Sequence, residues 1–212
     1  SPPGRGGVSI VRLSGPKSLK IAENIFNKPA KEFKERVAQF VNCYTQKNQI
    51  IDEGLSLYFK TPNSFTGEDV VEFQCHGSPV VVDLVLCSAL EAGARLAKPG
   101  EFSERAFLNG KIDLLQAEAI ADLIDSQSTQ AAKNAIQTLK GAFSEKINVL
   151  NSSLINVRTY LEAAIDFPDE EGVNFISEGK VQEKVEALSN ELKIIQTEAE
   201  QGHILQEGMN VV

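Results

Sequence analysis

The chain has 212 residues, enough for one large or two modest domains, and 42% hydrophobic with 24% charged residues is an ordinary globular composition. Its formal net charge of −8 argues against a self-sufficient nucleic-acid binder, because phosphate contacts need clustered Lys and Arg. No apolar run approaches the roughly 20 residues that span a bilayer, so no membrane association is expected. Three cysteines at unrelated spacings (Cys43, Cys75 and Cys87) favour a reducing, cytoplasmic setting over a disulfide framework.

The first half of the chain predicts a β-sheet with two helices. Five segments are β-branched, alternate in polarity or are bounded by turn residues, as strands are, and these are residues 8–13, 37–45, 50–60, 70–75 and 94–97. Helical spacing at 19–26, and a Ser78-Pro79 helix start that runs to Gly93, complete the order β-α-β-β-β-α-β. We therefore expect an α+β domain with a mixed sheet over residues 1–112.

Beyond Lys111 the hydrophobic period changes to that of long helices. One apolar seam recurs every three or four positions, with one irregularity near Gly141, and consists of Ala132, Ile136, Leu139, Phe143, Ile147, Leu150, Leu154, Val157, Leu161 and Ala164. It predicts a single helix of roughly 50 Å that stops at Asp166-Phe167-Pro168. A second seam runs from Val181 to Ala199. Neither seam can be buried alone, so we expect an all-α helical bundle in which the seams pack on each other, on Leu115, Ala119 and Leu123, or on absent chain.

Three charged side chains are candidate ligand contacts. Arg12 interrupts an apolar strand, and its planar guanidinium suits a carboxylate or a polar ring edge. Glu72 lies in another strand, where its carboxylate can accept two adjacent N–H groups such as those of a 2-amino-pyrimidinone ring. Lys111 follows a glycine stop and suits an anionic group. Each residue singly also fits a solvated face or a helix-end charge.

Other patterns predict neither a catalytic residue nor a metal site within this chain. The Gly-Lys pairs at 110–111 and 179–180 lack the upstream glycine and the following hydroxyl of a P-loop, so the chain should not hydrolyse GTP. Cys75 and His76 are neighbours in a strand and point to opposite faces, which disfavours a thiolate–imidazole pair. Two histidines make a Cys/His zinc site improbable. The glycine-rich segment 2–7 is either a phosphate-cradling loop or a flexible turn.

Four long segments, in order along the chain, together resemble one known family. They are PPGRGGVSIVRLSG, FKTPNSFTGEDVVEFQCHGSP, KPGEFSERAFLNGKIDLLQAEAIADLIDS and AAIDFPDEEGV. They are similar to the tRNA modification GTPase family called MnmE or TrmE, over essentially the whole chain. The resemblance implies a tetrahydrofolate-binding, dimerising domain at 1–112, similar to that of glycine-cleavage aminomethyltransferases. It further implies the first half of a helical domain at 113–207 and the start of a Ras-like G domain at 208–212.

The resemblance also implies ligands and partners. In the family an arginine of the first strand, a glutamate of the GEDVVE segment and a lysine after FLNG hold tetrahydrofolate, as a 5-formyl or 5,10-methylene derivative. The matching residues are Arg12, Glu72 and Lys111. The G domain would use GTP, Mg2+ and K+. The implied activity is modification of the wobble uridine of certain tRNAs by a cytoplasmic homodimer. An FAD-containing partner, MnmG, takes part and makes much of the tRNA contact.

Two alternative functions stay open at this point. One is a stand-alone folate-dependent enzyme similar to an aminomethyltransferase, which the long helical seams disfavour. The other is a non-enzymatic dimerisation scaffold with a vestigial folate site. The joint presence of Arg12, Glu72 and Lys111 counts against the scaffold.

Overall fold

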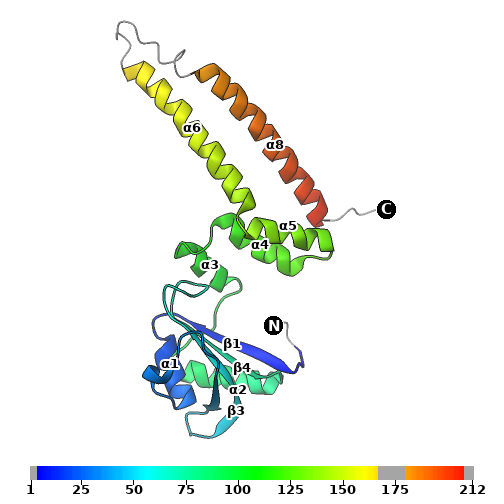
Figure 1. The fold of residues 1–212 in the computed structure, drawn as a ribbon. Coiled ribbons are helices and arrows are strands. Elements are labelled where there is room, and N and C mark those ends of the chain that lie inside the picture. Colours follow the sequence, from blue (N-terminus) through cyan, green and yellow to red (C-terminus); the bar gives the residue numbers. More distant parts are fainter. Residues whose placement is uncertain (1–3, 167–179, 208–212) are drawn as a thin grey trace. The chain divides into compact units, whose positions relative to one another are not determined.

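The computed structural model describes residues 4–166 and 180–207, with side chains up to residue 199. The chain divides into two compact units, Ser1–Ile112 and Asp113–Val212 (Figure 1). Within the described ranges, no helix is both long enough and apolar enough to cross a membrane.

The N-terminal unit is built on a four-stranded sheet in the order β1-β4-β3-β2. Its strands are Val8–Ser14 (β1), Gln39–Tyr44 (β2), Ile50–Phe59 (β3) and Val70–His76 (β4). The α+β class expected from the sequence is confirmed. The expected mixed sheet is corrected, because β2–β3, β3–β4 and β1–β4 all pair antiparallel. In the described chain, parallel pairing is confined to one isolated bridge between Glu35 and Tyr58.

The short strand expected at 94–97 is wrong, because this segment has no regular secondary structure. Arg95 donates hydrogen bonds to the Leu96 carbonyl and to Glu101, and the Lys98 N–H also donates to Glu101. The segment is therefore tied to the residues that follow it and not to a sheet edge.

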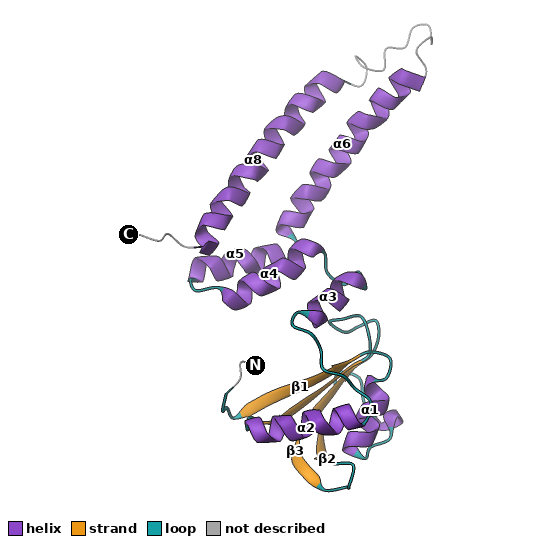
Figure 2. Cartoon of the chain, turned by 180° about the vertical axis from the view of Figure 1, so that it is seen from behind, coloured by secondary structure: helices purple, strands orange, loops and turns teal. Residues whose placement is uncertain are grey.

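Two helices cover one face of the sheet, Ser18–Phe26 (α1) and Pro79–Glu91 (α2), and Figure 2 shows α2 running across the strands. A 3-10 turn, Ala30–Glu32 (η1), follows α1. Alternation along the strands places every second side chain in this layer. Phe73 of β4 and Val85 of α2 are at most 2% exposed there. This layer forms the hydrophobic core of the unit.

The opposite face of the sheet, here called the open face, carries large apolar side chains at its surface. Ile10, Phe40 and Leu55 are 46%, 66% and 39% exposed within this unit. The strand register places them, with Gln74, in one row across all four strands. This face is therefore available to a ligand or another protein surface.

A short helix that the sequence did not predict, Glu101–Leu108 (α3), begins after Gly100. It ends in a Schellman cap, in which the N–H of Gly110 donates to Phe107 and that of Lys111 to Ala106. Gly110 has φ 66°, in the left-handed region that favours glycine. The end of α3 thus fixes the backbone of Lys111.

The second unit is helical throughout its described residues. Its helices are Leu114–Asp125 (α4), Thr129–Leu139 (α5), Ala142–Asp166 (α6) and Val181–Glu207 (α8). α4 packs against α5, and α6 lies antiparallel to α8 (Figures 1 and 2). Of the alternatives expected for the two apolar seams, the structure shows packing on each other, through α6 and α8. Their burial is partial, since Val157, Val181 and Ile195 are buried whereas Leu154 and Leu192 are more than half exposed.

The single helix expected from Ala132 onward is wrong, because α5 and α6 are separate helices. Gly141 has φ 85°, and the N–H groups of Lys140 and Gly141 close the end of α5 on the carbonyls of Ile136 and Thr138. The irregularity in the seam therefore marks a helix end. With 25 residues, α6 alone is ~37 Å long.

Two further expectations lie outside the described residues. They are the helix stop at Phe167-Pro168 and the start of a G domain at 208–212.

Strand β3 offers a test of the close packing in the sheet. A Cβ added to Gly54 would lie 2.1 Å from the carbonyl oxygen of Gln74 on β4. Gly54→Ala should therefore push the strands apart and lower the free energy of unfolding by about 2 kcal/mol.

The control for Gly54→Ala is Ser56→Ala in the same strand. The Ser56 hydroxyl is buried without a hydrogen-bond partner in the described part of the chain. Its removal should leave the free energy of unfolding unchanged or higher. Urea unfolding measures both, and equal losses would contradict this account.

Candidate ligand site on the N-terminal unit

Arg12 and Glu72 lie opposite one another on β1 and β4, on the open face. Arg12 Nε donates a hydrogen bond to Glu72 Oε1 at 2.7 Å. The Arg12 side chain is 40% exposed and that of Glu72 is 15% exposed, so solvent reaches both. Neither residue forms another side-chain hydrogen bond within residues 4–166 and 180–199. One carboxylate oxygen and the two terminal guanidinium nitrogens therefore remain available to a ligand.

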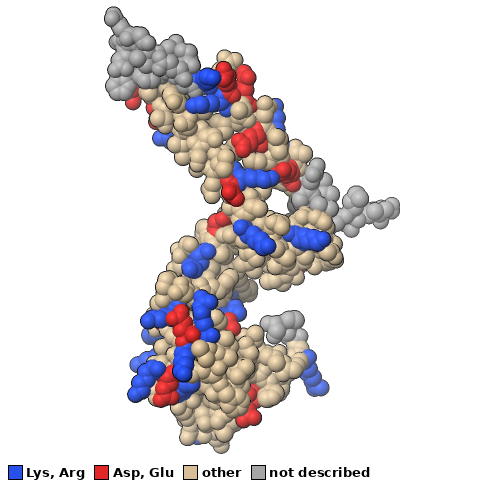
Figure 3. Space-filling view, in the orientation of Figure 1, with Lys and Arg blue, Asp and Glu red and all other residues tan. Residues whose placement is uncertain are grey.

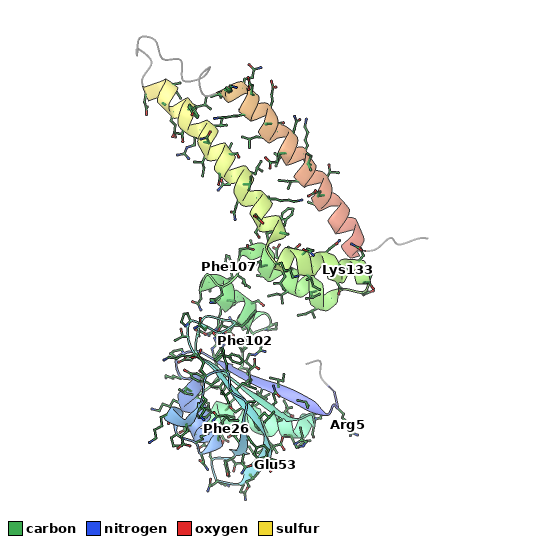
Figure 4. All side chains as sticks on the ribbon, viewed as in Figure 1. Arg5, Phe26, Glu53, Phe102, Phe107 and Lys133 are labelled. Atoms are coloured by element: carbon green, nitrogen blue, oxygen red, sulfur yellow. The ribbon has the colours of Figure 1, made fainter. Side chains whose placement is uncertain are left out.

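An aromatic ring from α3 also restrains Arg12. The guanidinium carbon lies 5.6 Å from the centroid of Phe102, close enough for attraction between the cation and the ring face. In Figure 4, Phe102 projects from α3 toward the strands. Glu72 and Phe102 thus restrain the Arg12 side chain from two directions.

Lys111 packs against the loop of residues 61–69, which joins β3 to β4. Its Cγ lies 3.1 Å from the position that a Cβ on Gly67 would occupy. Gly67 has φ 76°, so both its backbone and the space beside it favour glycine. Among the described side chains, Lys111 has no ion-pair partner and no hydrogen bond to Arg12 or Glu72. The structure thus brings Arg12 and Glu72 into contact and connects Lys111 to them only through the loop and α3.

A cluster of ion pairs, here called the ion cluster, ties α3 to this loop. It consists of Glu68, Arg95, Glu101 and Arg105. Arg105 Nη1 donates to both carboxylate oxygens of Glu68, at 3.0 and 2.9 Å, and its Nε donates to Glu101 at 3.0 Å. Hydrogen bonds from Arg95 and from the Lys98 N–H hold the pKa of Glu101 far below its usual range. Glu68 and Glu101 in turn raise the pKa of Arg105.

The same loop is bonded to β1 and to the end of α3. Ser14 donates to Glu68 Oε2 at 2.8 Å and shares a 2.7 Å hydrogen bond with the hydroxyl of Thr66. Asn109, just after α3, donates to the Thr66 carbonyl at 2.7 Å. The loop therefore joins the strand of Arg12 to the helix end that carries Lys111.

The base of the loop is held by Asp69. Its Oδ1 accepts hydrogen bonds from the Tyr58 hydroxyl at 3.0 Å and from the Thr61 N–H at 2.9 Å. Burial and this carboxylate raise the pKa of Tyr58 to about 12, so the phenol stays a hydrogen-bond donor at neutral pH.

Cys75 and His76 do not form a thiolate–imidazole pair. Cys75 is buried with its Sγ 3.5 Å from the Ser9 carbonyl, and burial raises the pKa of the thiol. His76 is exposed and its Nδ1 lies 2.7 Å from Asp52. The two side chains face different environments, as the alternation of the strand predicts.

The described end of the glycine-rich segment lies against the end of β4 at Gly6. The Gly6 N–H donates to the Gly77 carbonyl at 3.0 Å, and a Cβ on Gly77 would lie 2.3 Å from the Gly6 carbonyl oxygen. These contacts favour a turn over a phosphate-cradling loop for this segment. In the described part of the molecule, no group of three or more His, Cys, Asp or Glu residues could hold a metal ion.

The sequence interpretation missed Phe102, Glu68 and Arg105. One signal was present, since Glu101 and Arg105 have the i, i+4 spacing of an ion pair on a helix. Glu68 carries no comparable local signal, because its partner Arg105 lies 37 positions away along the chain.

Family models match both units. Residues 1–111 match the model described as "GTP-binding protein TrmE N-terminus", and residues 114–210 match "MnmE helical domain". The fold and these matches define a TrmE-type N-terminal domain followed by an MnmE-type helical domain. The chain belongs to the MnmE family.

Individual curated proteins similar to this chain carry the name MnmE as well. The chain is similar to "tRNA modification GTPase MnmE" of Legionella pneumophila strain Paris, with 54% identity over 212 residues, 100% of this chain and 47% of the relative. Proteins of the same name from Marinomonas and Proteus mirabilis are 56% identical over 210 residues and 53% identical over 213 residues. These matches cover 99% and 100% of this chain, but 45% and 46% of the relatives. The chain thus spans about half the length of the curated relatives it matches.

The lowered pKa of Glu101 gives its contribution to stability a pH dependence. The contribution of Glu101 is complete above the ordinary glutamate pKa of about 4.3. It is lost as pH falls toward the lower pKa that Glu101 has in the folded protein. Glu101→Gln should therefore lower the free energy of unfolding at pH 7, and its difference from wild type should shrink at pH 3. Urea unfolding at both values measures this difference. Glu104→Gln, an exposed position on the same helix, is the control, and a pH-independent effect of Glu101→Gln would contradict the assignment.

Proposed function

We propose that the chain is part of a tRNA modification GTPase. In this proposal residues 1–112 bind a tetrahydrofolate derivative and dimerise, 113–207 are the first part of the helical domain, and 208–212 begin the G domain. Membership of the MnmE family and the printed names of its relatives support this assignment. The single observation that carries the ligand proposal is the Arg12–Glu72 pair on the open face.

The candidate site suits the chemistry of a reduced folate. A pterin ring offers two adjacent N–H donors, which match the two oxygens of Glu72 if the ligand takes over or shares the oxygen that Arg12 now uses. The terminal nitrogens of Arg12 and the ammonium of Lys111 are donors for the ring carbonyl and for the carboxylates of the folate tail. The residues hold and orient the ligand, which itself supplies the one-carbon unit when bound. The donor is a 5-formyl- or 5,10-methylene-tetrahydrofolate.

The whole protein would hydrolyse GTP with Mg2+ and K+ in its G domain and modify the wobble uridine of certain tRNAs in the cytoplasm. An FAD-containing, MnmG-type protein would be its partner. The charge distribution supports the view that this partner makes much of the tRNA contact. Residues 113–212 hold 7 Lys and Arg against 17 Asp and Glu, whereas residues 1–112 hold 14 against 12. Figure 3 shows that basic and acidic side chains intermingle on the visible face of the N-terminal unit.

The open face supports a second copy of this chain as the dimer partner. Ile10, Leu55 and Phe40 are exposed apolar side chains in one row across the open face, with Gln74 between Ile10 and Leu55, and such exposed apolar surface is typical of a protein–protein contact. Phe40→Asp should therefore convert a dimer to a monomer in sedimentation velocity. The matched control is Val80→Asp, because Val80 on α2 is equally exposed at 67% but lies on the other layer. A Phe40→Asp variant that still dimerises would exclude this row from the interface.

Titration calorimetry with 5-formyltetrahydrofolate tests the ligand proposal. Wild type should bind saturably, and Glu72→Gln, Arg12→Ala or Lys111→Ala should each weaken binding about tenfold or more, because each removes a charge-assisted hydrogen bond. The control is Glu53→Gln, an exposed carboxylate on β3 labelled in Figure 4. A folded dimer that binds no folate would favour the scaffold alternative and overturn the proposal.

A further inference from the structure

We propose that Glu68 and Arg105 are positioning residues of the folate site, because their ion pair sets where Lys111 is held relative to Arg12 and Glu72. This inference rests on the proposed folate binding and deepens it. Neither residue is placed in contact with the ligand, so their role is exerted through α3 and the loop of residues 61–69.

Glu68 is connected to both strands of the site. It lies two residues before the start of β4 and four residues before Glu72, so the short stretch of backbone between them ties its position to that of Glu72. It also accepts a 2.8 Å hydrogen bond from Ser14 on β1, two residues beyond Arg12 on the same face. The carboxylate of Glu68 is thus fixed to the two strands whose side chains form the Arg12–Glu72 pair.

Arg105 is connected to Lys111. It lies in the last turn of α3, whose Schellman cap fixes the Lys111 backbone through a 2.8 Å hydrogen bond to Ala106. The Lys111 side chain rests on Gly67, the residue before Glu68. The Glu68–Arg105 pair therefore closes a bridge that runs from the strands to the helix end.

The geometry of this pair suits positioning more than stabilisation. Arg105 is 30% exposed and Glu68 is 23% exposed, and ion pairs that water reaches contribute little to the free energy of folding. Arg105 Nη1 bonds to the Glu68 carboxylate while its Nε bonds to Glu101, so two different nitrogens of one planar group fix direction as well as distance. A lysine at this position cannot reproduce that arrangement.

A double-mutant cycle in the full 212-residue chain tests the inference, with 5-formyltetrahydrofolate as the probe. In wild type, Lys111→Ala should raise Kd about tenfold. In an Arg105→Gln background, where Lys111 is already misplaced, Lys111→Ala should change Kd by less than about twofold. Glu72→Gln should keep its full effect in that background. Arg105→Lys should behave as Arg105→Gln. A purely structural role for Arg105 would lower the melting temperature without removing the dependence of binding on Lys111.

Two further variants keep the test decisive. Glu68→Gln is nearly isosteric and should show the same loss of dependence on Lys111 if Arg105→Gln fails to fold. Arg158→Gln removes an ion pair of α6, Arg158 Nε to Glu162 at 2.9 Å, and should leave the cycle unchanged. Absence of saturable binding by wild type would overturn the proposed function itself. Binding by wild type, with the Lys111 effect undiminished in both the Arg105 and Glu68 variants, would overturn only this inference.

Discussion

One-sided burial of the four-stranded sheet is the constraint on which the N-terminal unit depends. α1 and α2 cover the face that carries Phe73, so alternate side chains, including Arg12 and Glu72, lie on the open face. A shift of β1 by one residue would turn Arg12 toward the core, and a shift of β4 by one residue would do the same to Glu72. The hydrophobic core thereby fixes the register that brings a guanidinium and a carboxylate together at 2.7 Å.

The other part of the candidate site is the end of α3, which carries Lys111, and its position depends on electrostatics more than on burial. α3 has only eight residues, of which Glu101 and Ala106 are buried, and its apolar Phe107 and Leu108 are 42% and 71% exposed. The ion cluster and the Schellman cap hold it beside the loop of residues 61–69. The candidate site therefore combines Arg12 and Glu72, which the core positions, with Lys111, which follows the ion-paired helix α3. These three residues are far apart in sequence. The hydrophobic core positions Arg12 and Glu72, and the Glu68–Arg105 pair positions Lys111.

Local patterns made much of this structure predictable. A short β-branched run predicts β1, alternating apolar residues predict β3 and β4, a Ser-Pro start predicts α2, and a charge inside an apolar strand singles out Arg12. The break at Gly141 was missed because the apolar seam continues through it, and only the left-handed backbone there ends the helix. The 94–97 segment was assigned to a strand because the Arg95–Glu101 contact, which ties it to α3, leaves no trace in periodicity. Long-range ion pairs such as Glu68–Arg105 depend on the fold, so no local pattern contains them.

The Arg12 Nε–H resonance gives the most direct test of a folate site at this pair, because in the free protein that proton is bonded to Glu72. In an NMR titration with 5-formyltetrahydrofolate, this signal should shift saturably. The Lys111 ammonium signal should follow with the same Kd, since one ligand contacts both residues. Assignment with Arg12→Lys and Lys111→Arg variants identifies the two signals. Saturable folate binding that leaves both resonances in place would contradict this account of the site.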